Sequence, residues 1–335
     1  MKKKLNYILP VQCGAVDMAF LILNSKDQIN NNNNNNNNIY KDNQNENINT
    51  NEKLVLKSFD KKMVKINKFA SYLAGLFEGD GYIWIPSEFT IKKKKHNPMF
   101  ALTFNKKDIP LAKKILEYFK LGHIIIRKQN SIELRITSIK SLLIVIELIN
   151  GKLRTPKIDQ LYKLIDWINH HHSHNIYKLN LNNSSLSDDS WLAGFIDADG
   201  SFYIRNSVKQ IACKFYIEQR MIYKKTNESF EPILSKIALN FNVKLNIRKR
   251  INYKYNYFII KLENQNSVNF LINYLTEHKL NSSKYLDFLN WEKAFKLILN
   301  KSQYTNEGRI TILNLKNNMN DKRTNFNWNH LNNLY

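Results

Sequence analysis

The sequence predicts an α+β protein made of two copies of one α-β-β-α-β-β-α unit, each followed by a closing helix. Two observations predict this architecture. Residues 73–81 read LAGLFEGDG and residues 192–200 read LAGFIDADG, and the same order of helix-like and strand-like segments follows each motif. The two Asp-Gly pairs lie 119 residues apart, so the repeat has the size of a domain and not of a solenoid unit.

The first unit is assigned to residues 61–169. A helix covers the first motif, with Asn67 as a candidate cap and Gly81 at its end. Apolar residues that alternate predict strands, and apolar residues at helical spacing predict helices, one of them opened by Pro110. The predicted segments are a helix over 68–80, a strand over 82–86, a hairpin over 89–105, a helix over 109–120, two strands around a turn at 129–131, and helices over 139–150 and 157–169.

The second unit is assigned to residues 188–318, after a polar linker over 170–187 and before a tail over 319–335. Ser187 is the candidate cap of its motif helix. The predicted segments are a helix over 188–199, strands over 201–206 and 211–220, a helix over 232–242, a hairpin over 243–264, and helices over 267–280 and 284–300.

The N-terminal residues differ from both units. Residues 25–60 include nine consecutive asparagines and are predicted to be a disordered linker, because an Asn-rich tract buries too little apolar surface to order itself. Residues 1–24 include NYILPVQCGAVDMAF, which resembles part of cytochrome c oxidase subunit 1. We therefore interpret residues 1–24 as a segment that an upstream exon encodes.

The charge points to a polyanionic partner. The net charge is +23, and residues 1–60 supply only +1 of it. A basic folded body indicates nucleic acid first and an anionic membrane second. No apolar stretch approaches the roughly 20 residues that span a bilayer, so no membrane partner is expected. The two cysteines, Cys13 and Cys213, exclude a disulfide framework and a zinc cage, which favours a reducing compartment.

Small residues in the two motifs predict how the units meet. Gly75 and Gly79 are four residues apart and share one helix face, and Gly194 and Ala198 repeat this spacing. Small residues at this spacing let two helix backbones approach closely. The two motif helices are therefore predicted to pack against each other about a pseudo-twofold axis.

The acids at the ends of the motifs predict a metal site. Asp80 and Asp199 stand in the last turn of their helices, where a negative charge opposes the helix dipole. Bringing the two ends together costs more unless a cation lies between the carboxylates. Oxygen donors without histidine or cysteine suit Mg²⁺. Two such acids beside a basic surface indicate metal-assisted phosphodiester hydrolysis.

Other acidic residues and a histidine cluster are less suited to this metal site. Glu78 and Asp197 lie two residues earlier, roughly 200° around the helix, and are predicted to be structural, for example by bonding the adjoining strand. DADGSF begins like a calcium-binding EF-hand loop, but Phe202 replaces its essential glycine. A histidine cluster in the linker lacks matching ligands for a transition metal: His170, His171, His172 and His174.

The paired motif resembles that of the LAGLIDADG homing endonucleases, in their single-chain form with two repeats, over residues 67 to 318. The resemblance implies two curved antiparallel sheets that form a saddle over DNA. It also implies that Asp80 and Asp199 are the catalytic ligands of the metal. A basic residue is expected at the start of each closing helix, which falls on Lys157 and Lys284.

The same resemblance implies a glutamine near the scissile phosphate. The segment FYIEQR places Gln219 there, whereas LTFNKKD in the first unit offers Asn105 at about that position. Because strand residues alternate between faces, every second side chain of the sheets would meet DNA. The candidate contacts to bases or phosphates are Tyr203 and Arg205 with Ser201, then Lys244, Asn246, Arg248 and Arg250, and Lys92, Lys93, Lys94 and Lys95 in the first hairpin.

These inferences predict a monomeric, Mg²⁺-dependent endonuclease that a group I intron encodes and that cuts both strands of a specific double-stranded DNA site, in a mitochondrion. The alternative is a maturase, in which the same fold binds its own intron RNA and assists splicing, with or without DNA cleavage. A third reading, a repressor that binds DNA without cutting it, is disfavoured because both motif acids are intact.

Overall fold

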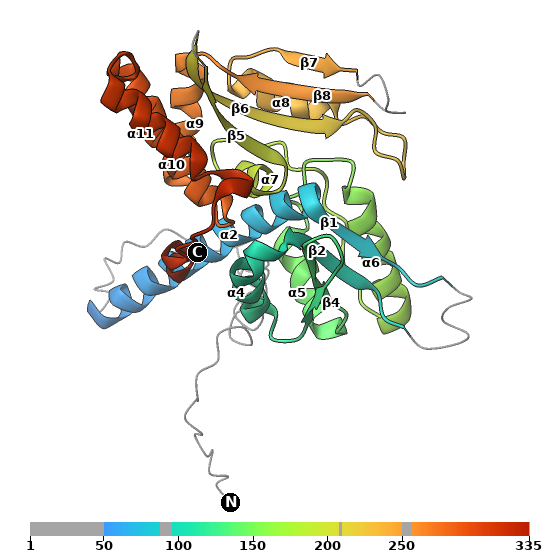
Figure 1. Ribbon diagram of the computed structural model, residues 1–335. Helices are drawn as coiled ribbons and strands as arrows, with labels where there is room; N and C mark the ends of the chain where they lie inside the picture. The colour runs from blue at the N-terminus through green and yellow to red at the C-terminus, as the bar shows by residue number, and fades with distance from the viewer. Residues whose placement is uncertain (1–49, 88–95, 208–209, 250–255, 335) are drawn as a thin grey trace, which may run out of the picture.

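The computed structural model describes residues 50–87, 96–207, 210–249 and 256–334. It contains two units with the same order of elements, and the predicted α+β fold is confirmed (Figure 1). The elements of the first unit are α2 (Thr50–Asp80), β1 (Gly81–Trp84), β2 (Met99–Asn105), η1 (Lys106–Asp108), α4 (Ile109–Phe119), β3 (His123–Ile126), β4 (Ser131–Ile136), α5 (Ile139–Ile149) and α6 (Ile158–His172).

The second unit repeats this order and adds a C-terminal extension. The elements of the unit are α7 (Trp191–Asp199), β5 (Gly200–Asn206), β6 (Ile211–Arg220), α8 (Glu231–Asn240), β7 (Leu245–Arg248), β8 (Tyr257–Leu262), α9 (Gln265–Glu277) and α10 (Lys284–Leu299). The extension consists of η2 (Ser302–Tyr304), α11 (Asn306–Asn317), η3 (Asn320–Lys322) and η4 (Asn329–Asn333).

Each unit forms one four-stranded antiparallel sheet, with the orders β1-β2-β4-β3 and β5-β6-β8-β7. The registers match as well, since Gly81 pairs with Leu102 and Gly200 pairs with Ile217. Corresponding positions of the two units can therefore be read directly from the pairing.

The two motif helices, α2 and α7, lie side by side between the sheets (Figure 1). A Cβ atom built on Gly75 would lie 1.9 Å from the carbonyl oxygen of Trp191, and one on Gly194 would lie 2.0 Å from that of Tyr72. One on Gly79 would lie 2.1 Å from the Cβ atom of Ala198. The helices touch backbone to backbone, as the small residues predict.

Aromatic side chains fill the core behind the second sheet. Phe202 of β5 packs against Phe215 of β6 at 5.0 Å between ring centroids, and against Trp291 of α10 at 5.3 Å. Each of these rings is at most 1% exposed, so the closing helix is fixed firmly to the sheet. This packing places the first residue of α10 near the end of the motif helix.

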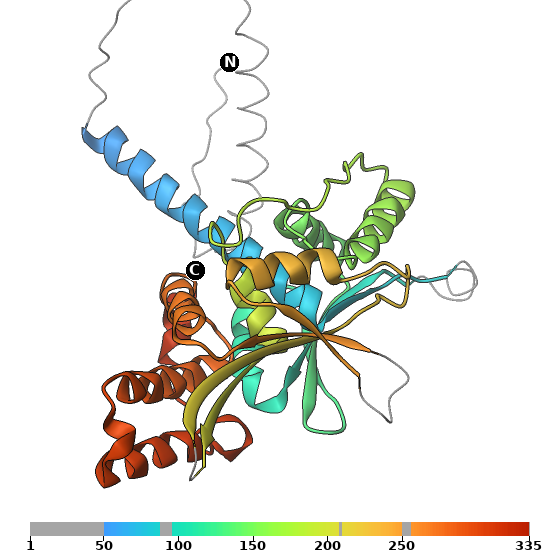
Figure 2. The same ribbon diagram turned by 90° about the horizontal axis from the view of Figure 1, so that it is seen from above.

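Several predicted boundaries differ from the structure. Helix α2 begins at Thr50, so residues 50–60 are helical and not linker, and Asn67 lies inside the helix and does not cap it. Figure 2 shows the N-terminal part of α2 extending beyond the body. Helix α7 begins after Ser190, three residues later than the predicted cap Ser187. The rest of the predicted linker, residues 25–49, and all of residues 1–24 lie outside the described part of the chain.

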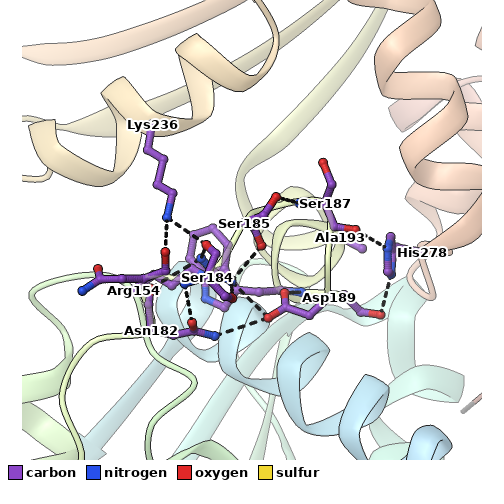
Figure 3. Close-up of polar contacts among 12 residues, drawn as sticks. Arg154, Asn182, Ser184, Ser185, Ser187, Asp189, Ala193, Lys236 and His278 are labelled. Carbon is purple, nitrogen blue, oxygen red and sulfur yellow. Dashed lines mark hydrogen bonds and ion pairs between the residues drawn. The ribbon is translucent and has the colours of Figure 1, made fainter.

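The segment between the units is tied to both of them (Figure 3). Arg154, whose side chain is 1% exposed, pairs with Asp189 at 3.0 Å and donates to the carbonyl oxygen of Ser184 at 2.7 Å. Lys236 of the second unit donates to the same carbonyl oxygen at 2.8 Å. The linker thus holds one relative placement of the two units. Among the described residues, no helix has the length and apolarity that a membrane span needs.

The C-terminal extension returns to the first unit. Tyr118 of α4 donates to the carbonyl oxygen of Leu334 at 3.1 Å, and a ring nitrogen of His330 lies 3.1 Å from the carbonyl oxygen of Asn281. The described part of the tail, residues 319–334, therefore packs across the junction between the units.

Candidate active site

Two carboxylates stand where the C-terminal ends of α2 and α7 meet. Asp80 is exposed to solvent and Asp199 is partly exposed. A Cβ atom on Gly79 would lie 3.4 Å from Oδ2 of Asp199, so that carboxylate lies against the end of the other motif helix. Burial raises the pKa of Asp199 to about 7, and the charge of Asp80 adds to the rise. Although part of Asp80 contacts solvent, desolvation by the surrounding protein also raises the pKa of its carboxyl group.

Two lysines bind backbone carbonyl oxygens at the same ends of the motif helices. Nζ of Lys157 donates to the carbonyl oxygens of Gly79 at 2.7 Å and Gly81 at 3.0 Å. Nζ of Lys284 donates to the carbonyl oxygens of Ala198 at 2.6 Å and Ile196 at 3.2 Å. The carbonyl oxygen of Ile196 also accepts from the backbone N–H of Gly200. Both ammonium groups lie at the C-terminal ends of the motif helices, where a positive charge complements the helix dipole.

The lysines also offset the charge of the two acids. Burial lowers the pKa of both Lys157 and Lys284, whereas Asp80 and Asp199 act in the opposite direction on each of them. In turn, both lysines hold the pKa of each acid below the value that burial alone would give. The four groups therefore form one electrostatically coupled cluster on the pseudo-twofold axis.

Gln219 joins this cluster in the second unit alone. Its Nε2 donates to Oδ2 of Asp199 at 3.0 Å, and its Oε1 accepts from the backbone N–H of Arg220. Asn105 does not occupy the matching place. Its side chain is exposed and accepts from the backbone N–H of Lys107, which caps η1.

The strand register explains this difference. Because Leu102 corresponds to Ile217, the residue that corresponds to Gln219 is Phe104, which is 7% exposed. Asn105 lies one residue further and thus on the opposite face of the sheet. Asn105 therefore does not take the place of Gln219 in the first unit, and the site is asymmetric.

Glu78 and Asp197 are buried, as structural residues should be, but they do not bond the adjoining strands. Glu78 accepts from the backbone N–H groups of Arg154 and Thr155, at 2.9 and 2.5 Å. Asp197 accepts from those of Asn281 and Ser282, at 2.7 and 3.1 Å. Both loops lead directly into the closing helices that begin beside Lys157 and Lys284.

These loop residues are not among the predicted site residues, although the sequence contains a signal for them. Residues 153–157 read LRTPK and residues 280–284 read LNSSK. Both segments have a buried leucine, a hydroxyl residue two positions later and the lysine at the end. A second repeat of this kind marks Thr155 and Ser282.

The outer face of the second sheet carries the predicted polar residues. Ser201, Tyr203 and Arg205 are exposed, while Phe202 and Ile204 between them are buried. A hollow of about 700 Å³ extends from Asp199 across this face. Its lining includes Ser201, Tyr216, Glu218, Asn246, Arg248 and Lys261.

Strand β7 follows the alternation less closely than predicted. Lys244, Asn246 and Arg248 are exposed, but Ile247 is 56% exposed as well, and β7 lies at the edge of the sheet. Nη1 of Arg248 pairs with Oε2 of Glu218 at 2.9 Å. Arg250 and Lys92, Lys93, Lys94 and Lys95 lie outside the described residues.

The first sheet presents a charged group that the sequence analysis did not single out. Glu133 of β4 pairs with Arg127 at 2.9 Å and with Arg135 at 2.6 Å. The alternation in residues 131–136, SIELRI, places Glu133 and Arg135 on one face. This group is the counterpart, on the first unit, of the polar face around Arg248.

The carboxylates of Asp80 and Asp199 suit a divalent cation whose remaining ligands are water and substrate phosphates. Within the described ranges, no three histidine, cysteine, aspartate or glutamate side chains are grouped to bind a metal. Asp80 and Asp199 supply two carboxylates, and Mg²⁺ commonly takes one or two carboxylates together with water and substrate phosphates. His170, His171 and His172 lie in the last turn of α6. Strand β5 begins at Gly200, directly after Asp199, and this strand excludes an EF-hand loop there.

Comparisons with known proteins identify the family of the chain. The family model of the LAGLIDADG endonucleases matches residues 73–171 and 192–295. The chain is 30% identical to the intron-encoded DNA endonuclease aI3 of Saccharomyces cerevisiae over 86% of this chain and 78% of the relative. It is 33% identical to an uncharacterized 37.2 kDa protein of cox1 intron 2 in Schizosaccharomyces pombe, over 73% of this chain and 71% of the relative.

Solved structures share the fold. The LAGLIDADG homing endonuclease I-SmaMI bound to cleaved DNA superposes with a TM-score of 0.61 and 21% identity, over 76% of this chain and 98% of that one. The two family matches together cover more than half of the sequence, one for each unit that contributes an acid to the site. The chain therefore belongs to the LAGLIDADG endonuclease family.

Proposed function

We propose that the protein is a monomeric, site-specific endonuclease that cuts both strands of double-stranded DNA and serves intron homing. The observation that carries the proposal is the cluster of Asp80, Asp199, Lys157 and Lys284 on the pseudo-twofold axis, between two polar sheet faces. Two related acids suit two scissile phosphates, one on each strand. A net charge of +22 outside residues 1–60 suits a nucleic acid partner.

The relatives support this substrate and a mitochondrial location. The Saccharomyces cerevisiae relative is named as an intron-encoded DNA endonuclease, and the Schizosaccharomyces pombe relative is named for a cox1 intron. Related structures are described as bound to DNA, one of them in the presence of calcium ions. We extend these properties to this chain, with Mg²⁺ as the cofactor.

The side chains divide the work in the following way. Asp80 and Asp199 hold the cation, which when bound supplies positive charge to the phosphodiester that is cut. Lys157 and Lys284 favour the ionised form of the two acids and add positive charge beside the phosphates. Gln219 fixes one oxygen of Asp199 and offers a polar contact on one strand alone. The sheet faces position the duplex, with Arg and Asn able to read guanine and adenine.

A maturase activity on the intron RNA is the second candidate, and the extension of α2 favours it. Lys61, Lys62 and Lys65 are exposed on this helix. They precede Asp80 by at least 15 residues, which is more than about 22 Å along a helix and away from the end that carries the acid. A basic surface this far from the DNA site is free to meet a second nucleic acid.

The deciding experiment uses the full chain and the sequences that flank its reading frame. A supercoiled plasmid with the flanking exons joined should be linearised with Mg²⁺ and not with EDTA. In parallel, the unspliced intron should be tested for splicing with and without the protein. Splicing without any cleavage of the intronless plasmid would replace the endonuclease proposal by the maturase.

We expect the affinity for DNA to depend steeply on salt. Each phosphate that a lysine or arginine neutralises contributes about −0.9 to the slope of log K against log salt concentration. The basic sheet faces should give a slope steeper than roughly −3, measured by fluorescence anisotropy in Ca²⁺ or without metal. A shallower slope would mean that the excess positive charge does not face the duplex.

We expect the metal-free protein to lose stability as the pH rises through neutrality. The pKa of Asp199 is raised from 3.8 to about 7 in the folded protein. Folding therefore retains a proton that the unfolded chain releases, so this contribution is complete below pH 4 and is lost as the pH passes 7. Thermal unfolding from pH 5 to 8 should show a fall in Tm that is smaller in Asp199→Asn than in the wild type. Identical pH profiles for these two proteins would contradict the assignment.

Because Mg²⁺ competes with the proton on Asp199, it should raise Tm more at pH 8 than at pH 6.

A further inference from the structure

The residue that precedes each motif donates a hydrogen bond to an acid of the other motif. The hydroxyl of Tyr72 donates to Oδ2 of Asp197 at 2.7 Å, and Nε1 of Trp191 donates to Oε2 of Glu78 at 2.5 Å. Tyr72 and Trp191 hold the same place, directly before Leu-Ala-Gly, so the pseudo-twofold axis relates the two bonds. Both aromatic rings are fully buried.

In the first unit, the bond from Trp191 reaches the lysine through two further steps. Glu78, also fully buried, accepts from the backbone N–H groups of Arg154 and Thr155. The hydroxyl of Thr155 then accepts from the backbone N–H of Lys157 at 3.2 Å. Lys157 in turn bonds the carbonyl oxygens at the end of α2.

In the second unit, the bond from Tyr72 follows the same route. Asp197 accepts from the backbone N–H groups of Asn281 and Ser282 and from the hydroxyl of Ser282 at 2.5 Å. That hydroxyl oxygen lies 3.1 Å from the backbone nitrogen of Lys284, which donates to it. In the second unit, every link from the ring of Tyr72 to Lys284 is thus a hydrogen bond at 3.1 Å or less.

We propose that Tyr72 and Trp191 are positioning residues that set Lys284 and Lys157, so that each unit's lysine is placed by a donor from the other unit. A buried carboxylate that loses one donor keeps its need for hydrogen bonds and turns toward the remaining ones. Those donors belong to the loops before α6 and α10, so the loops move and shift the lysines. Docking of the two units thereby completes the site for both strands.

The test compares two tyrosine hydroxyls at the contact between α7 and its neighbours. Tyr72→Phe removes the donor to Asp197. Tyr274→Phe is the matched control, since Tyr274 is also buried. Its hydroxyl donates to the carbonyl oxygen of Asp189 at 2.9 Å and accepts from the backbone N–H of Ala193 at 3.1 Å, both at the opposite end of α7. Both variants should lower Tm by similar amounts and bind DNA with unchanged Kd.

Cleavage and amide exchange should separate the two variants. The single-turnover cleavage rate at saturating protein should fall about tenfold in Tyr72→Phe and stay within about twofold of wild type in Tyr274→Phe. Hydrogen exchange of the peptide that contains Asn281 and Ser282 should accelerate in Tyr72→Phe alone. Trp191→Phe should have the same effect on the peptide with Arg154 and Thr155.

The outcomes distinguish this inference from the proposed function on which its cleavage readout rests. If the wild-type protein cuts no DNA, the endonuclease proposal fails, and the exchange measurement still tests the route from ring to loop. Equal cleavage rates in Tyr72→Phe and Tyr274→Phe, or equal exchange at Asn281 and Ser282, would overturn the positioning role.

Discussion

Asp80→Asn and Asp199→Asn should each abolish cleavage of both DNA strands, by about a thousandfold or more, while both proteins still bind the target. The reason is the close approach of the two motif helices. A carboxylate that lies against the end of the partner helix shares its surroundings with the other acid, and both acids act on both lysines. Replacing either acid therefore removes a ligand common to the two cuts.

The same variants should bind DNA as well as wild type, or more tightly, when Mg²⁺ is absent. The charge of Asp80 contributes to the raised pKa of Asp199, because two ionised carboxylates at this distance repel each other. An amide relieves this repulsion and removes one negative charge that faces the phosphates. Anisotropy in EDTA measures this directly.

A strand-resolved digest of a supercoiled target plasmid tests the shared-metal account. Asp166→Asn is a suitable control, because Asp166 is 62% exposed on α6 and pairs with Lys178, away from the site. That variant should cut like the wild type. Clean nicking of one strand at the wild-type rate by Asp80→Asn or Asp199→Asn would show two independent sites instead.

The main contacts between the units could be predicted from the sequence because they depend on local spacing. Glycines four residues apart predict a close helix contact, and the acid before the final glycine then falls beside its counterpart. The exposed residues of β5 follow from simple alternation. These predictions require no knowledge of the residues that lie opposite in space.

The parts that could not be predicted depend on register and on contacts distant in sequence. Asn105 and Phe104 differ by one position, and only the pairing of Gly81 with Leu102 decides which of them faces the site. The partners of Glu78 and Asp197 lie at least 76 residues away along the chain. The start of α2 was missed because residues 50–60 directly follow the Asn-rich tract and were grouped with it, although they continue the motif helix.

Gly75→Ala and Gly194→Ala should be the most destabilising single-methyl substitutions at the contact between the units. The new methyl group would meet a backbone carbonyl oxygen at 1.9 Å in the first case and at 2.0 Å in the second. Backbone atoms inside a helix cannot turn away, so the helices must separate and the flanking rings lose their packing. We expect a loss of roughly 3 kcal/mol, against a helix-propensity gain of about 1 kcal/mol from replacing glycine by alanine.

At Gly79, unlike at Gly75 and Gly194, a second substitution can restore the helix contact, because the opposing atom belongs to a side chain. Its methyl group would meet the Cβ atom of Ala198 at 2.1 Å, and Asp199 only at an ordinary 3.4 Å. Gly79→Ala alone should therefore be unstable, whereas Gly79→Ala with Ala198→Gly moves one methyl group across the contact and keeps one glycine and one alanine in the pair. The double variant should unfold within roughly 1 kcal/mol of the wild type in urea and should retain DNA cleavage. Two results would mean that the motif helices do not meet backbone to backbone: a gain of stability in Gly75→Ala as large as helix propensity alone provides, or a double variant as unstable as Gly79→Ala. In either case Asp80 and Asp199 would not be held together in one site.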